Sequence, residues 1–115
     1  MKIQEITSEG IRFDSDSLIY AEHEADCCEE NYADFEQLDD EARNYEFAEN
    51  LVFEAVDGAG FRFGSGGRMF FVPCYSMQNG WYSTNIVIRF YNDDTGKTNT
   101  VLSFDAKLTD WSDAE

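Results

Sequence analysis

Three thiols and a single imidazole are the side chains of this sequence with the widest chemical repertoire. With a neighbouring carboxylate, they would supply the soft and borderline ligands that zinc takes in proteins. However, adjacent cysteines project about 100° apart on a helix and rarely share one ion, and no Cys-x-x-Cys pair is present. The sequence favours buried free thiols that fill a packing interface, so we expect no cofactor. The alternative is a zinc site built from His23, Cys27, Cys28 and Cys74.

Catalytic patterns are absent from the sequence. His23 is the only histidine, so Ser-His or Cys-His catalysis would have to use it. No Gly-x-Ser-x-Gly pattern accompanies it. The loop Gly58–Gly64 lacks the Lys-Ser/Thr pair of a phosphate-binding loop. We therefore predict a non-enzymatic protein, and a small enzyme would require a cleft that contains His23.

Carboxylates are concentrated in the first half of the chain. Residues 1–57 hold 18 Asp/Glu and 3 Lys/Arg, whereas residues 58–115 hold 6 and 5. Between Glu22 and Glu41 there are ten carboxylates and no Lys or Arg. Acidic proteins repel nucleic acid and anionic membranes, so we expect neither as a direct partner. The asymmetry suggests an acidic surface that meets something basic; the alternative is that the acidity serves only solubility.

The elements that position these residues follow from the spacing of the apolar side chains. From about Asp26 to about Asn44 the apolar residues recur at intervals of three and four, which predicts an amphipathic helix. Asp26 and Glu29 would form a capping box at its start. The stripe of this helix comprises Cys28, Tyr32, Phe35, Leu38, Ala42 and Tyr45.

Short strands are predicted on both sides of that helix. Apolar residues alternate or run together over 11–13, 18–21, 51–56, 61–63, 69–75, 81–91 and 100–108. Asn79-Gly80 predicts a tight hairpin, and Pro73 predicts an edge strand or a bulge. The predicted fold class is α+β: a largely antiparallel, meandering sheet with one acidic amphipathic helix packed on it.

Length and composition predict one domain over residues 1–115. The chain is 43% hydrophobic and 16% aromatic, enough to build a core without disulfide or metal staples. No apolar run approaches the length of a membrane span. Met1–Glu5 lacks the apolar core of a signal peptide, and the number of cysteines is odd. We therefore expect a cytoplasmic protein with reduced thiols.

Several strings in the sequence resemble a group of short bacterial and phage proteins to which no activity is assigned. They are Asp26–Glu29, Tyr32–Phe35, Gly60–Gly64 and Phe71–Ser76, followed by Gln78-Asn79-Gly80. The resemblance covers residues 23 to about 90. It implies a phage or prophage context, and hence a bacterial host cell, but no particular chemistry.

Charge density then leads to a hypothesis about function. Twenty helical residues span roughly 30 Å, and duplex DNA carries about one charge per 1.7 Å, so the acidic run would approach roughly half the charge density of DNA. We predict a protein-binding module, such as a phage-encoded inhibitor of the anti-CRISPR or anti-restriction type, that occupies a basic groove of a nuclease by charge mimicry. Its contact residues would be Glu29, Glu30, Asp34, Glu36, Asp39, Asp40 and Glu41, with Trp81 and Tyr82 as aromatic anchors. The alternative is a zinc- or thiol-stabilised accessory domain whose acidity serves only solubility.

Overall fold

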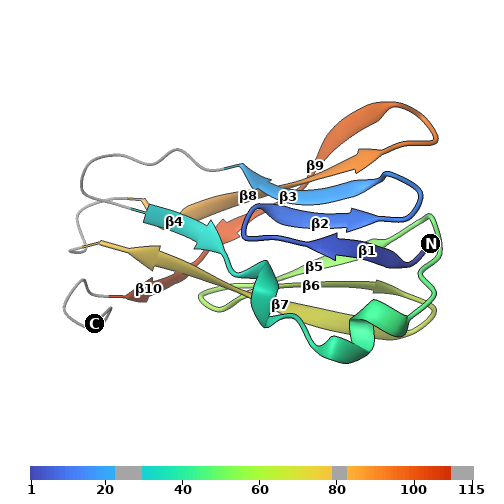
Figure 1. The fold of residues 1–115 in the computed structure, drawn as a ribbon. Helices are drawn as coiled ribbons and strands as arrows, with labels where there is room; N and C mark the ends of the chain where they lie inside the picture. Colours follow the sequence, from blue (N-terminus) through green and yellow to red (C-terminus); the bar gives the residue numbers. More distant parts are fainter. Residues whose placement is uncertain (23–29, 79–82, 110–115) are drawn as a thin grey trace.

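Two facing β-sheets make up the molecule (Figure 1). The computed structural model describes residues 1–22, 30–78 and 83–109. The first sheet has the strand order β1-β2-β3-β8-β9 and is antiparallel throughout. Its strands are β1 (Ile3–Ile6), β2 (Gly10–Phe13), β3 (Leu18–Glu22), β8 (Asn85–Asn92) and β9 (Lys97–Asp105).

The second sheet has the order β10-β7-β6-β5, with a further strand, β4, paired to β7. Only the pairing of β10 with β7 is parallel among the described strands. The strands are β4 (Glu30–Ala33), β5 (Val52–Val56), β6 (Gly60–Ser65), β7 (Arg68–Met77) and β10 (Lys107–Thr109). Two short 3₁₀ helices, η1 (Phe35–Gln37) and η2 (Asp40–Asn44), follow β4.

Phenylalanines from both sheets fill the space between them. Phe47, on the segment that leads to β5, lies at the centre of this core and is only 1% exposed. Its ring centroid lies 5.6 Å from that of Phe13 in the first sheet. On the second sheet it lies 5.5 Å from Phe63 and 5.6 Å from Phe70. Because one buried ring contacts both layers, the two sheets share a single core.

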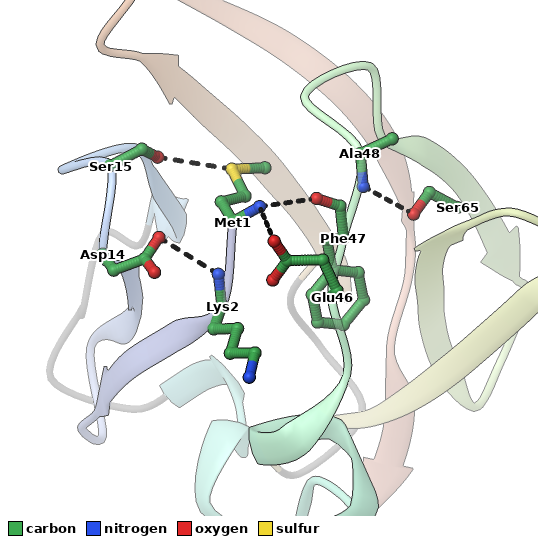
Figure 2. A network of polar contacts seen from close by, with 8 residues as sticks. All are labelled: Met1, Lys2, Asp14, Ser15, Glu46, Phe47, Ala48 and Ser65. Atoms are coloured by element: carbon green, nitrogen blue, oxygen red, sulfur yellow. Dashed lines mark hydrogen bonds and ion pairs between the residues drawn. The ribbon is translucent and has the colours of Figure 1, made fainter.

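Polar contacts of the first residues attach β1 to the same segment (Figure 2). The Met1 ammonium donates to the Phe47 carbonyl at 2.7 Å and lies 3.7 Å from a Glu46 carboxylate oxygen. On the other side of Phe47, the Ala48 N–H donates to the Ser65 hydroxyl at 2.9 Å. The segment 46–48 thus joins the edge strand β1 to strand β6 of the second sheet.

The predicted amphipathic helix is absent, and the α+β fold class is wrong. Residues 30–44 form strand β4 and the two 3₁₀ helices, and no α-helix occurs in the described ranges. Two physical effects act against a helix here. Like charges four residues apart, such as Glu30 and Asp34, destabilise a helix by about 0.2–0.5 kcal/mol per pair. Asp and Asn side chains also compete for backbone N–H groups in turns, as Asp39 does by accepting from the Glu41 N–H.

Most of the strand predictions are confirmed. All seven predicted strand regions overlap observed strands, and Ile86, Ile88 and Phe90 share a buried face of β8. Within the predicted strand region 100–108, Phe104 and Ala106 are buried, whereas Leu108 is 52% exposed. The chain breaks its pairing at Ala106, and β10 then pairs with β7 of the other sheet. The predicted Asn79-Gly80 hairpin lies outside the described residues.

Pro73 lies in β7 where the pairing with β6 ends and the pairing with β4 begins. It pairs with Gly60 of β6 on one side. On the other side the ladder with β4 begins only at Cys74, although the Pro73 carbonyl accepts from the Asp34 N–H at 2.8 Å. Proline lacks an N–H, so it fits where no ladder bond is required. The edge-strand prediction for this part of β7 is confirmed in the described residues.

Candidate interaction surface

Six of the predicted contact carboxylates lie on one short path along the second sheet. We call this set the acidic ridge: Glu30, Asp34, Glu36, Asp39, Asp40 and Glu41. It follows β4, which pairs with β7, and then η1 and η2; Figure 1 shows η1 crossing in front of β7. Asp34 is partly buried and the other five side chains are exposed. Glu29, Trp81 and Tyr82, the remaining predicted contact residues, lie outside the described residues.

A buried polar network fixes the start of the ridge. Asn31, 9% exposed, donates from Nδ2 to the carbonyls of Ser83 at 3.0 Å and Asn85 at 3.3 Å. Its Oδ1 accepts from the Ser76 hydroxyl, which in turn accepts from Gln78 Nε2 at 2.6 Å. Buried amides and hydroxyls are costly unless they are paired. Their mutual bonds therefore hold β4 in one register against β7 and bind it to the segment before β8.

Apolar anchors alternate with the carboxylates in the rest of the ridge. Phe35, Leu38 and Ala42 are buried, at 1%, 6% and 0% exposure. The carboxylate of Asp34 accepts from Gln37 Nε2 at 2.6 Å. The periodic apolar residues of the sequence thus do face the core, but from 3₁₀ turns and not from an α-helix. The carboxylates between them project into water.

The ridge segment itself contains one cation, Arg43 of η2, which forms no ion pair with any residue that the structure describes. Arg68 of β7 approaches Glu41 at 2.5 Å, and within the described ranges the other five ridge carboxylates form no ion pair. Elsewhere the arginines of the C-terminal half do neutralise acids: Arg89 pairs with Glu22 at 3.0 Å and Arg62 pairs with Glu54. Most of the described ion pairs between carboxylates and cationic groups therefore lie outside the ridge.

The outer face of β4 and β7 carries an aromatic strip beside the ridge, which the sequence analysis missed. Tyr32 and Tyr75 are directly paired across the strands, with ring centroids 5.6 Å apart. Phe71, also on the outer face of β7, is 41% exposed. Burial, and then the nearby carboxylates of Asp34 and Glu30, raise the pKa of Tyr32. Two-residue alternation in 69–77 could have revealed the strip, whereas the helical period placed Tyr32 in the core.

Of the residues named in the thiol and metal predictions, only Cys74 lies within the described residues. This thiol is fully buried in β7, as expected for a packing residue, and burial raises its pKa to about 12. A thiol in that environment is protonated and a poor nucleophile. His23, Cys27 and Cys28 lie outside the described residues, and the described residues contain no group of three or more metal-ligating side chains.

Comparison of the chain with protein-family profiles, with curated proteins and with solved structures finds no match. The resemblance to short bacterial and phage proteins therefore stays a prediction. None of the helices in the described part of the chain has the length and apolar character to cross a bilayer.

Proposed function

We propose that this protein is a non-enzymatic binding module that docks its acidic ridge against a basic surface of another protein. The observation that carries the proposal is the arrangement of charge: six carboxylates within twelve residues of chain, of which one pairs with an arginine. A stretch shaped for stability alone would intersperse lysines among them, because like charges repel.

The geometry also supports a rigid, preorganised ridge. Buried side chains recur through the segment, and the Asn31 network ties its first strand to β7. Carboxylates held in fixed positions lose less conformational freedom when they bind than those on a mobile tail. A partner that pairs with them would gain electrostatic attraction without first ordering this segment.

The partner class follows from the charge. Lys/Arg-lined grooves that bind nucleic acid are strongly basic surfaces of proteins, so a nucleic-acid-handling protein of the bacterial host, such as a nuclease, is the partner we propose. By occupying its groove, the ridge would compete with the phosphate backbone. This function would be carried out in the cytoplasm, where such enzymes work.

The test is a pull-down from bacterial lysate with the immobilised chain at two salt concentrations. We expect capture of a basic nucleic-acid-binding protein at about 50 mM NaCl and its loss at about 500 mM, because salt screens charge pairing. The captured protein should also lose activity on its nucleic acid when the chain is added. Four ridge substitutions made together, Glu30→Gln, Asp34→Asn, Glu36→Gln and Asp40→Asn, should abolish both effects.

A matched variant separates the ridge from net charge. Asp16, Glu49, Asp93 and Asp94 are exposed and lie in loops outside the ridge. Amide substitution of these four changes the net charge by the same amount as the ridge variant and should preserve capture. Capture that survives high salt, or that is lost equally in both variants, would contradict the proposal.

A further inference from the structure

A hollow of about 670 Å³ opens on the outer face of the first sheet, on the other layer from the acidic ridge. Strands β1, β2 and β3 form its floor, while Tyr91 of β8 and Thr98 of β9 line one side. Figure 1 shows the turn end of the β8–β9 hairpin extending beyond β1, β2 and β3. The volume lies within the range of about 300–1,000 Å³ that is typical of ligand sites.

Two tyrosines and a leucine share the floor of this hollow. Leu18 pairs directly with Tyr91, and Tyr20 lies two residues further along β3 on the same outer face. Diagonal neighbours of this kind are separated by about 7–8 Å. Both tyrosines are partly exposed. The strand residue opposite Tyr20 is Gly10, where the Ile19 carbonyl leaves no room for a side chain.

Hydrogen-bonding side chains stand around the aromatic floor. Arg12 pairs with Glu5 at 3.4 Å, and both side chains are about half exposed, at 45% and 54%. Glu9 and Thr98 add further polar groups at the rim. A guanidinium offers several donors in one plane and a carboxylate offers two acceptor oxygens, so the pair can bind adjacent hydroxyl groups of a ligand.

We propose that the hollow binds an uncharged oligosaccharide. The apolar faces of sugar rings stack on tyrosine, while their hydroxyl groups require the donors and acceptors that the rim provides. A floor that is open and spans several strands suits a chain of sugar units better than a small enclosed molecule. Two glutamates and a net charge of −16 disfavour phosphates, uronic acids and nucleic acid. This binding is independent of the proposed docking of the ridge, which uses the other sheet.

The test is titration of the isotopically labelled full chain with defined hexasaccharides, followed by amide chemical shifts and by calorimetry. The probes are the uncharged hexamers of β-1,4-glucose, β-1,4-xylose, β-1,4-mannose and α-1,4-glucose. Hexagalacturonate and an oligothymidylate serve as charged comparisons. We expect at least one uncharged hexamer to shift the amides of β1–β3, with an affinity unchanged between about 50 and 500 mM NaCl. This insensitivity to salt distinguishes the hollow from the ridge.

Variants of the floor complete the test. Tyr20→Ala and Tyr91→Ala should each weaken binding about tenfold, whereas Tyr20→Phe should retain it because the ring remains. Tyr32→Ala, at the matched outer face of the second sheet, should leave sugar binding unchanged. Arg12→Gln, at an exposed position that does not support the core, should weaken binding with the fold intact. The proposal fails if no uncharged hexamer shifts these amides, if the Tyr20, Tyr91 and Arg12 variants bind as the parent does, or if only the charged ligands bind.

Discussion

The outer surfaces of the two sheets use charge in opposite ways. On the second sheet, one of six ridge carboxylates is matched by an arginine. On the first sheet, the hollow holds the Glu5–Arg12 pair above a floor that includes Tyr20 and Tyr91. Unmatched charge attracts a partner over a distance and is sensitive to salt. Paired charge around aromatic rings acts only at contact, so the two faces are suited to different kinds of ligand.

The largest effect should come from the residue on which both faces depend. Phe47→Ala is expected to lower the free energy of unfolding by about 3–5 kcal/mol, because it removes a buried ring that contacts both sheets. Denaturant unfolding would measure the loss, and hydrogen exchange should show reduced protection in both sheets together. Phe71→Ala, the same change at an exposed position, should cost less than about 1 kcal/mol. Loss of protection in one sheet alone would show that the faces are not supported by a common core.

A smaller effect should separate the two faces. Asn31→Ala removes the acceptor of the Ser76 hydroxyl proton and one donor to the carbonyls of Ser83 and Asn85, and should cost about 1–3 kcal/mol. Because the bonds lie at β4, amide exchange should accelerate in β4 and β7 and leave β1–β3 unchanged. Asn99→Ala, at an exposed position of β9, is the control. Equal acceleration in the first sheet would contradict the assignment of this network to the ridge.

The buried thiol beneath the ridge should make stability depend on pH. The pKa of Cys74 is raised from 9.0 to about 12 in the folded chain, so the unfolded chain releases the proton first. Stability from this group is therefore complete below about pH 9 and declines as the pH rises toward 12. Urea unfolding near pH 7 and near pH 11 should show a larger decline for the parent chain than for Cys74→Ala. Equal declines would mean that the thiol ionises as easily in the folded state as in the unfolded state.

The smallest effect should come from Arg68, the arginine that pairs with a ridge carboxylate. Arg68→Gln frees Glu41 and removes a guanidinium that lies 4.7 Å from the centroid of the Phe70 ring. We expect a stability change below about 1 kcal/mol, because the pair is exposed. Binding of the basic protein captured by the ridge should tighten by roughly two- to fivefold. Arg12→Gln, which frees Glu5 in the hollow, should leave that binding unchanged; equal tightening would indicate a response to net charge alone.

Local patterns predicted those parts of the fold in which one face of a strand is apolar. Ile86, Ile88 and Phe90 occupy alternate positions in the predicted strand region 81–91, and all three are buried in β8. The apolar spacing of the segment 30–44 fits an α-helix, but the first residues of this segment pair with β7 as strand β4. Tyr32 shows the consequence: the helical period placed it inward, whereas strand pairing places it outside, next to Tyr75.

For the candidate surfaces too, some features follow from the sequence and others only from the tertiary structure. The sequence by itself determined that residues 22–41 are acidic and that they cannot all be neutralised by nearby cations, because composition and spacing suffice for that conclusion. Only the tertiary structure decided that Arg68 reaches Glu41 while Arg89 and Arg62 pair elsewhere. It also placed Tyr20 and Tyr91 in one hollow, although seventy residues lie between them in the sequence. Such placements depend on which strands pair, and pairing is set by the packing of a shared core that no local segment encodes.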